Sequence, residues 1–434
     1  MTKELYYDSA YISEFFAQVI SCERISTKSD GEKKSEYAVI LDRTAFFPEQ
    51  GGQGCDGGFL EVVAVTDDQE GTDPSLEQAR VIDVSIEDSE EGSIITHVVD
   101  KEIPVGSKVR GCIDWHHRFS NMQQHTGEHI FSGLVHGKFG YNNVGFHLSD
   151  SEVTMDYDGP ITLEEALELE KRANEVIWSN IEVLCEFPEA DRLKDIPYRS
   201  KKELEGDVRI VTIPGVDICA CCAPHVDRTG EIGLLKVTNL QNYKGGVRVN
   251  ILCGKRALEY INSEHAIVSE LSGMLTTSSD KIITSVKRAF EDNTELKTQL
   301  TRTKEELISY EIEKLLGEDS NENSNSDKNG SDVFESTDKS DIFLIKDDGF
   351  DSNMMRKFVN ALAEKKEGYC GVFAGSAKEG YRFIIGSGSA GKDCRELCNV
   401  MRTEFGAKGG GQPVMVQGSI GPVSITEVIR KMVN

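Results

Sequence analysis

The stretch His125-Thr126-Gly127-Glu128-His129 places two histidines four residues apart. Apolar residues follow it at helical spacing over 130–135, and this periodicity predicts a helix. Residues four apart project from the same face of a helix, so His125 and His129 are expected to point in one direction. Two imidazoles placed in this way can bind one metal ion together.

A second stretch, Cys221-Cys222-Ala223-Pro224-His225, lies much further along the chain and adds a thiolate and an imidazole. Zinc accepts such a mixture of nitrogen and sulfur ligands. Cys219 and Cys222 lie beside Cys221, so the residues alone leave the choice of thiolate open. A purely structural zinc is the main alternative, but histidine-rich sites carry out chemistry more often than closed, cysteine-rich ones.

The residues around both stretches resemble the editing domain of alanyl-tRNA synthetase and its free-standing relatives, the AlaX-type alanyl-tRNA editing proteins. The similarity covers residues 114–118 and 124–129, and then residues 221–226 and 229–233. In this family three residues separate the cysteine ligand from the histidine ligand. The resemblance therefore implies a Zn²⁺ ion bound by His125, His129, Cys221 and His225.

Two glycine-rich motifs extend the resemblance toward both ends of the chain. Residues 46–54, with Asp56 and Gly58, are similar to a loop near the start of the editing module. Residues 408–413 are similar to the glycine motif of the DHHA1 domain that ends alanyl-tRNA synthetases. A loop without side chains lets the backbone approach a substrate closely. We expect substrate to be bound by Gly51, Gly52, Gln53, Thr126, His147, Gly409, Gly410 and Gly411, with catalytic roles for Gln53 and Thr126.

The fold class that these patterns predict is α+β. Short apolar runs broken by Gly, Asp and Ser predict a small N-terminal β-barrel over residues 1–100. Residues 101–255 combine β-branched runs with helices that should begin near Phe119 and Leu163, the latter capped by Thr162. Sheet strands with segregated helices indicate a zinc-bearing α+β editing domain.

The remaining residues predict three further segments. Apolar residues recur at helical spacing over 256–316, as expected for a helical coiled-coil connector. Residues 317–340 are rich in Ser, Asn, Asp and Glu, which is typical of a flexible acidic linker. Strand-like and helical runs alternate over 341–434 and predict a compact α/β, DHHA1-like domain.

The charge limits how the protein could bind nucleic acid. Its formal net charge is −26, which disfavours nonspecific binding to a phosphate backbone. Residues 341–434 are an exception, because 13 Lys and Arg there outnumber 11 Asp and Glu. The sequence contains no apolar run long enough to span a membrane and no N-terminal targeting signal, and its 11 cysteines lack a disulfide-framework spacing. We therefore expect a cytoplasmic protein without membrane partners.

The resemblance implies an aminoacyl-tRNA deacylase, a carboxylic ester hydrolase that works without ATP in translational proofreading. Its expected partner is tRNA(Ala) mischarged with serine or glycine, and a homodimer through the coiled coil and the DHHA1-like domain is a further expectation. The hydroxyl of Thr126 could recognise serine, since an alanyl ester would leave it unpaired at a cost of ~1 to 3 kcal/mol. An ordinary capping role for this threonine is the alternative.

Other functions remain open at this point. A threonyl-tRNA-type editing deacylase shares both ligand pairs but not the glycine motif of residues 408–413. A noncatalytic, zinc-stabilised RNA-binding protein would need the same metal ligands without hydrolysis. A DHH-type phosphoesterase is disfavoured, because Trp115 separates Asp114 from the next two histidines. The zinc ion could polarise the ester, hold the substrate's amino group or lower the pKa of water.

Overall fold

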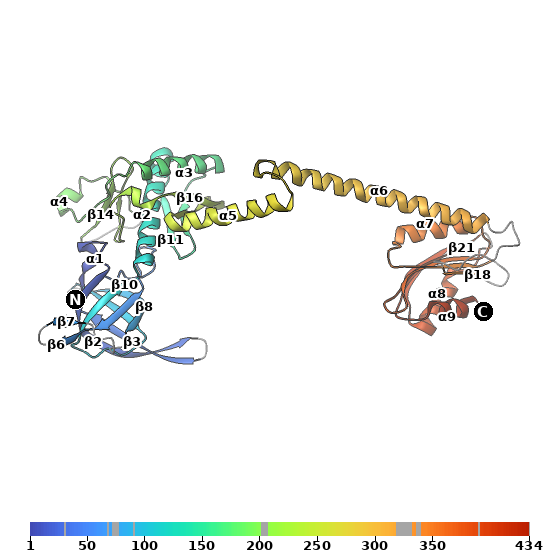
Figure 1. Ribbon diagram of the computed structural model, residues 1–434, viewed down its shortest axis with the longest axis horizontal. Helices are drawn as coiled ribbons and strands as arrows, with labels where there is room; N and C mark the ends of the chain where they lie inside the picture. Colours follow the sequence, from blue (N-terminus) through green and yellow to red (C-terminus); the bar gives the residue numbers. More distant parts are fainter. Residues whose placement is uncertain are drawn as a thin grey trace. The chain divides into compact units, whose positions relative to one another are not determined.

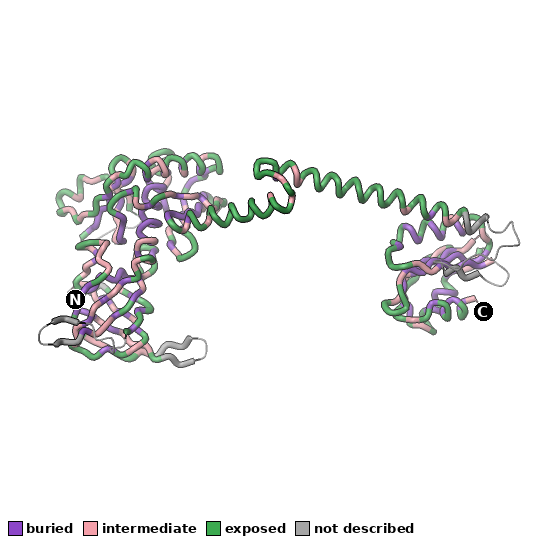
Figure 2. The backbone as a smooth tube through the Cα atoms, viewed as in Figure 1, coloured by how far each residue is buried: buried purple, intermediate pink, exposed green. Residues whose placement is uncertain are grey.

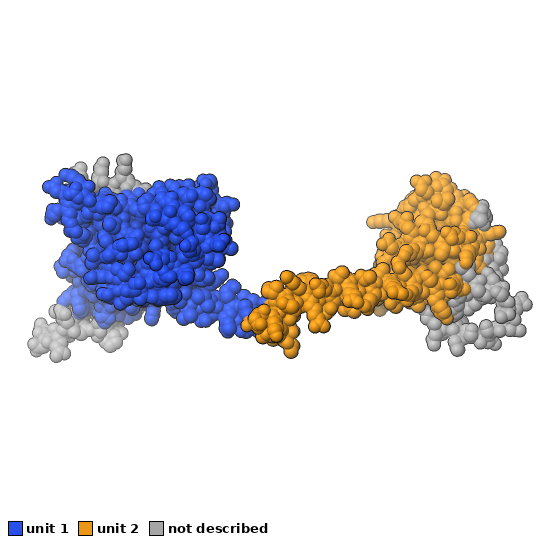
Figure 3. All heavy atoms as spheres, turned by 90° about the horizontal axis from the view of Figure 1, so that it is seen from above, with its two compact units in different colours: residues 1–271 blue, residues 272–434 orange. Residues whose placement is uncertain are grey.

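The chain folds into two units, residues 1–271 and 272–434, which are coloured separately in Figure 3. We describe each unit by itself. The computed structural model describes residues 1–29, 32–66, 69–71, 78–89, 92–200, 207–317, 332–335, 340–388 and 391–433.

A closed six-stranded barrel begins the first unit (Figure 1). Its strands follow the order β10-β2-β3-β9-β8-β5, and every pair is antiparallel. Alternate side chains such as Phe15, Ala17 and Val19 are buried in its core. The strands are β2 (Glu14–Ser29), β3 (Glu32–Leu41), β5 (Gly58–Val62), β8 (Ala79–Ser89), β9 (Gly92–Val99) and β10 (Lys108–Ile113). The predicted barrel is confirmed, and it extends past residue 100 because β10 closes it.

Short elements accompany the barrel. Strand β1 pairs in parallel with β4, and β6 pairs with β7 in a small hairpin. The bounds are β1 (Lys3–Glu4), α1 (Leu5–Asp8), β4 (Arg43–Thr44), β6 (Ala64–Thr66) and β7 (Gln69–Gly71). The segment between β4 and β5 carries the first glycine motif and leads from the barrel toward the metal ligands.

Helix α2 (Trp115–Phe139) follows β10 directly and forms the centre of the α+β part (Figure 1). The Asp114 side chain caps its first turn by accepting the backbone N–H of His117, and Gly140 ends the helix in a left-handed conformation with φ of 72°. Most of the helix is buried, including polar residues, because it packs against strands of two sheets. Figure 2 shows this run of buried backbone.

Two antiparallel sheets and helix α3 (Leu163–Trp178) surround α2. One sheet has the order β11-β12-β17-β16 and the other β13-β14-β15. The predicted cap of α3 is confirmed, since Thr162 forms a capping box with Glu165. The bounds are β11 (Asn143–Leu148), β12 (Val153–Tyr157), β13 (Leu184–Glu186), α4 (Ala190–Leu193), β14 (Ile210–Ile213), β15 (Asp217–Ala220), η1 (Thr229–Ile232), β16 (Leu235–Tyr243) and β17 (Gly246–Cys253).

A buried ion pair joins α2 to the barrel. Arg118 is fully buried, and its guanidinium contacts the carboxylate of Asp56 through Nε and Nη2. It also donates to the backbone oxygens of Ala10 and Ala45 at 2.9 and 2.5 Å, while Asp56 accepts the backbone N–H of Phe47 at 2.6 Å. A buried charge that lost this partner would be strongly destabilising. The pair therefore fixes the glycine-rich segment relative to the helix that carries the histidines.

The second unit contains a six-stranded sheet in the order β18-β19-β20-β21-β23-β22. Only the β19–β20 pair is parallel. The strands and helices predicted for 341–434 are confirmed as secondary structure, although the assignment to a DHHA1-like domain remains a prediction. The bounds are β18 (Asp332–Glu335), β19 (Ile342–Lys346), α7 (Ser352–Ala363), β20 (Tyr369–Ser376), β21 (Gly380–Ser387), α8 (Cys394–Phe405), β22 (Lys408–Gln412), β23 (Met415–Ile420) and α9 (Ile425–Val433).

The predicted connector is helical. It consists of α5 (Gly254–Met274), a short 3-10 turn η2 (Ser279–Lys281) and α6 (Ile282–Gly317), and Figure 2 shows that α6 is exposed along most of its length. Its pairing as a coiled coil stays a prediction. Of the predicted linker at 317–340, residues 318–331 and 336–339 lie outside the described residues. Within that range Asp332–Glu335 form β18, which pairs with β19, and the flexible linker stays a prediction. Of the described helices, none has the length and apolar character needed to span a bilayer.

Candidate metal centre

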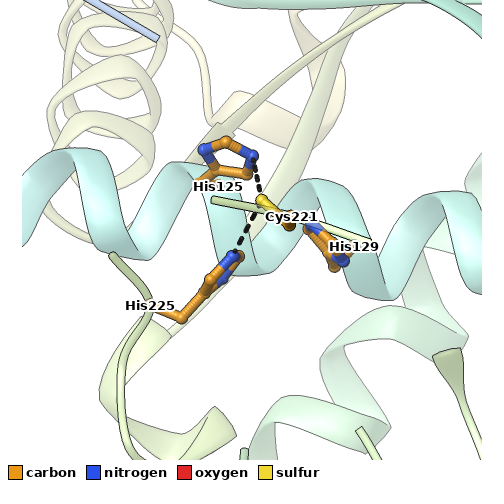
Figure 4. A group of neighbouring side chains, drawn as sticks. All are labelled: His125, His129, Cys221 and His225. Atoms are coloured by element: carbon orange, nitrogen blue, oxygen red, sulfur yellow. Dashed lines mark hydrogen bonds between the residues drawn. The ribbon is translucent and has the colours of Figure 1, made fainter. Parts of the chain in front are cut away.

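The structure brings the four predicted zinc ligands together (Figure 4). His125 and His129 project from α2, while Cys221 and His225 lie in the loop that follows β15. All four donor atoms lie within 4.8 Å of one another. The sulfur of Cys221 lies 3.5 Å from Nε2 of His125 and 3.4 Å from Nε2 of His225.

Two of the imidazoles are oriented by the side chains of other predicted site residues. Nδ1 of His125 contacts Oε1 of Gln53 at 2.8 Å, and Nδ1 of His225 contacts Oγ1 of Thr126 at 3.0 Å. Both Gln53 and Thr126 are fully buried. Since each Nδ1 is occupied, Nε2 is the ring nitrogen that remains for a metal, as is usual when an outer partner fixes the tautomer.

Asp217 orients the third imidazole, that of His129. Its Oδ2 accepts a hydrogen bond from Nδ1 of His129 at 3.0 Å. Arg199 donates to the same carboxylate through Nε at 2.7 Å and Nη2 at 3.0 Å. Burial raises the pKa of Asp217, but His129 and Arg199 outweigh it, so the net pKa is lowered and the carboxylate stays ionised.

The distances around Cys221 fit a tetrahedral zinc ion. With Zn–N near ~2.0 Å and Zn–S near ~2.3 Å, the sulfur and nitrogen ligands of such an ion should be about 3.5 Å apart. The two measured S···N distances, 3.5 and 3.4 Å, agree with this value. A single thiol proton could satisfy only one of the two imidazole nitrogens. A cation bound among the four donor atoms would interact favourably with the sulfur and with all three imidazole nitrogens.

The neighbouring groups also favour a neutral imidazole at His225 and protonated thiols at Cys219 and Cys222. Burial, together with repulsion from His129 and His125, lowers the pKa of His225 well below its usual value, so its nitrogen lone pair is available. Burial raises the pKa of Cys222 to about 12 and that of Cys219 to about 11, so both remain thiols. Cys219 does form a second close group with His129 and Asp217. However, Asp217 already bridges His129 and Arg199, which makes that group a support for the first.

A cavity of about 660 Å³ opens onto this centre. His125, His129 and Cys221 line it together with the backbone of Gly51 and Gly52. Its walls are completed by aromatic and cationic side chains, which include Tyr7, Phe146, Phe187 and Arg209. A volume of this size lies in the range of small-molecule binding sites.

The two cavity glycines have conformations that other residues rarely adopt. Gly51 and Gly52 have φ of +65° and +85°, and a Cβ added at Gly52 would lie 2.7 Å from the carbonyl oxygen of Phe146. The carbonyl of Gly52 accepts the backbone N–H of Leu148 at 2.8 Å. Gly52 therefore packs against strand β11 with no room for a side chain. Gly51 and Gly52 also line the cavity, and their part in substrate binding stays a prediction.

The other predicted site residues lie elsewhere. His147 is exposed on β11, and the described residues that line the cavity include its neighbour Phe146 but not His147. Gly409, Gly410 and Gly411 lie in the exposed edge strand β22 of the second unit. Their part in substrate binding stays a prediction.

Three buried polar residues of the site escape sequence reasoning. Arg199 belongs to a cluster of basic residues that suggests a solvated face, yet its ion pair with Asp217 is largely buried. Asp217 belongs to no motif. Glu128 lies inside the histidine motif, and its position between the two ligands is a signal that the sequence does offer.

Two protein families match parts of this chain. Residues 208–250 match the family described as the threonyl and alanyl tRNA synthetase second additional domain. Residues 1–117 match the class II (A) tRNA synthetases. The first match contains β14, β15 and the Cys221–His225 loop, and the second contains the barrel and the first glycine motif.

Individual relatives match a longer part of this chain than the two families do. The alanine–tRNA ligase of Ignicoccus hospitalis is 31% identical over 317 residues, which cover 71% of this chain and 32% of the ligase. The alanyl-tRNA editing protein AlaX-L of Pyrococcus horikoshii is 27% identical over 330 residues, or 73% of this chain and 74% of that protein. The alanyl-tRNA editing protein Aarsd1-A of Xenopus laevis is 28% identical over 287 residues, or 64% of this chain and 65% of that protein.

The chain thus spans about a third of the length of the ligases that it matches, and a larger share of the editing proteins. The resemblance to the alanyl-tRNA synthetase editing domain and its free-standing relatives is confirmed.

Proposed function

We propose that this chain is a zinc-dependent aminoacyl-tRNA deacylase that removes serine, and secondarily glycine, from mischarged tRNA(Ala). The observation that carries the proposal is the convergence of three imidazole nitrogens and one thiol on a cavity that shares a wall with Gly51 and Gly52. The names of AlaX-L and Aarsd1-A as alanyl-tRNA editing proteins support the choice of the alanine system.

Hydrolysis of a mischarged tRNA compensates for the limited specificity with which a binding site selects alanine. A binding site for alanine discriminates poorly against glycine or serine, because a methyl or hydroxyl group changes binding by only ~1 to 3 kcal/mol. A separate hydrolytic site can remove such errors. The reaction adds water across the ester, so that the amino acid leaves as a free acid and the terminal ribose hydroxyl of the tRNA is restored.

The residues of this chain would prepare that reaction in three ways. His125, His129, Cys221 and His225 would hold a Zn²⁺ ion, which supplies a Lewis acid for the ester carbonyl. The Gly51–Gly52 backbone would lie against the aminoacyl ribose, where a side chain would block access. Phe146 and Phe187 would exclude bulk water from the cavity.

For Gln53 and Thr126 we propose positioning roles. The oxygen of each side chain contacts a ligand imidazole, and neither residue is among the described residues that line the cavity. Thr126 also accepts the backbone N–H of Val226 at 3.3 Å. Its hydroxyl therefore contacts both the imidazole of His225 and the backbone of the next residue. These contacts favour a role in orienting His225 over a role in recognising serine.

For the second unit we propose a role in tRNA affinity and dimer formation in the cytoplasm. Strand β22 presents Gly409–Gly411 at the edge of the sheet, where a backbone without side chains could meet RNA closely. The local balance of charge over 341–434 supports this assignment, because the rest of the chain is strongly acidic.

A deacylation assay with seryl-, glycyl- and alanyl-tRNA(Ala) tests the proposed function. We expect release of serine and glycine to exceed release of alanine, and a strong chelator to abolish it. Seryl-tRNA(Thr) serves as the comparison substrate for a threonyl-type editing deacylase. Binding of tRNA without release of any amino acid would instead indicate a noncatalytic, zinc-stabilised RNA-binding protein.

A further inference from the structure

Glu128 is a buried carboxylate beside the metal centre for which the proposed function has so far given no role. It lies on α2 between the two histidine ligands and is 1% exposed. A carboxylate is rarely buried in this way without a specific purpose, because removing its charge from water is costly.

One oxygen of Glu128 is held by hydrogen bonds from two neighbouring side chains. Its Oε1 accepts hydrogen bonds from Oγ of Ser132 at 2.7 Å and from Nδ2 of Asn143 at 2.6 Å. Ser132 in turn contacts the hydroxyl of Tyr157 at 2.8 Å. These contacts hold Oε1, and the second oxygen, Oε2, lies near the imidazole of His129.

The second oxygen lies on the metal side of His129. Oε2 of Glu128 is 3.8 Å from Nε2 of His129, and this is the nitrogen left free for a metal because Nδ1 donates to Asp217. A zinc ion would lie ~2.0 Å from that nitrogen. The carboxylate oxygen is therefore within the reach of one water molecule from the centre.

The order of residues has a chemical parallel. Two histidines four apart on a helix, with a glutamate among the residues between them, characterise zinc hydrolases in which the glutamate serves as general base. Residues 125–129 have the order H-x-x-E-H, which is one of the two arrangements found in such enzymes.

We propose that Glu128 is the general base of this site, an inference that rests on the proposed function. Its Oε2 takes a proton from the attacking water as the water oxygen bonds to the ester carbonyl carbon. The bond between that carbon and the ribose oxygen then breaks, and the proton passes from Glu128 to the ribose oxygen. Glu128 is not among the described residues that line the cavity, so a water beside Nε2 of His129, which does line it, would connect Oε2 to a bound ester.

The test is the full-length Glu128→Gln variant, which keeps the shape of the side chain and an oxygen for Ser132 and Asn143. We expect kcat on seryl-tRNA(Ala) to fall by on the order of 100-fold to 10,000-fold, with KM changed less than about twofold. Zinc content should remain at the wild-type level by elemental analysis. The matched control is Glu170→Gln, a half-buried carboxylate of α3 that pairs with Lys236 away from the metal centre.

Two results would overturn the role of Glu128. One is activity of Glu128→Gln within about threefold of wild type, and the other is a loss of activity that follows a loss of zinc, which would make Glu128 a support of the metal. If Glu128→Gln fails to fold, Glu128→Asp decides, because it keeps the charge but withdraws the oxygen by one methylene. Its kcat should fall at least about tenfold with zinc retained, and wild-type activity would contradict the proposal. A wild-type protein that released no amino acid would instead contradict the proposed function itself.

Discussion

His129 and Asp217 form a hydrogen bond of 3.0 Å in which Nδ1 donates to Oδ2, and they lie 88 residues apart in the sequence. Arg199 holds the other side of the carboxylate, so Asp217 cannot turn away from the imidazole. Such an outer partner fixes the tautomer of a metal-binding histidine and raises its basicity.

Replacing Asp217 with Asn should therefore weaken zinc binding by roughly 10- to 100-fold while the four ligands stay in place. Competition with a chelator of known affinity measures this change. Asp156→Asn is the matched control, because it breaks a comparable ion pair with Arg248 in the neighbouring sheet. Equal zinc affinity in the two variants would show that Asp217 does not orient His129.

Replacing Cys221 with Ala should remove zinc from the protein, because the sulfur of Cys221 contacts two ligand nitrogens. Cys222→Ala should retain it, since Cys222 remains a thiol whose pKa burial raises to about 12. Elemental analysis of both purified variants checks the prediction. Zinc retained without Cys221 and lost without Cys222 would reverse the choice of ligand.

Replacing Thr126 with Val removes the hydroxyl that contacts His225 but keeps the β-branch. If Thr126 positions His225, hydrolysis of seryl and alanyl esters should fall together and zinc affinity should fall with them. If the hydroxyl instead recognised serine, the seryl to alanyl ratio would fall about tenfold, which corresponds to ~1.4 kcal/mol. Thr238→Val, at a half-buried threonine of β16, controls for the loss of a hydroxyl elsewhere.

The barrel should lose stability in mild acid because of His97. Burial lowers the pKa of His97 to about 4. In the unfolded chain a histidine titrates near ~6.5, so only the unfolded state gains a proton between these values. The contribution of His97 is complete above pH ~6.5 and falls by roughly 3 kcal/mol as the pH drops toward ~4.

Urea unfolding at about pH 7 and about pH 5 measures this slope, with a chelator present so that zinc release does not contribute. Both tryptophans, Trp115 and Trp178, lie in the first unit, so their fluorescence reports on it. His97→Gln should flatten the dependence on pH, and His265→Gln, at an exposed position of α5, should leave it unchanged. An equal slope in all three proteins would rule out His97 as its source.

A protein that ends at residue 276 should keep zinc and ester hydrolysis, since the first unit comprises residues 1–271 and holds all four ligands. It should require more tRNA to reach the same rate, because the proposal assigns tRNA affinity to the second unit. Rates measured over a range of tRNA concentrations test this. Unchanged apparent affinity would exclude a tRNA-binding role for Gly409–Gly411.

Local signals in the sequence predict the parts of the fold that local contacts determine. The capping box at Thr162 and the helical period after His129 both specify elements within a few residues of themselves. The closure of the barrel by β10 does not follow from such signals, because it depends on pairing with β2 and β5, which precede it by many residues.

The residues of the candidate site also differ in whether the sequence predicts them. The four ligands can be predicted because their spacing and residue types are specific to metal binding. Asp217 and Arg199 cannot, since an acid and a base that belong to no motif look like surface residues until the fold packs them against each other. The sequence also does not predict strand β18. The stretch around it is rich in Ser, Asn, Asp and Glu, which indicates a linker, yet β18 pairs with β19.

The distance along the chain between the ligands also has a consequence during synthesis. Cys221 follows His125 by 96 residues, so both helical histidines leave the ribosome well before the thiolate does. At roughly 5 to 20 residues per second, this interval lasts about 5 to 20 seconds. Of the four candidate ligands, a nascent chain in that interval offers an incoming ion only the two imidazoles of α2. On the proposed function, tight metal capture is therefore a late event in the biogenesis of this protein, after the segment that contains β15 and its loop has emerged.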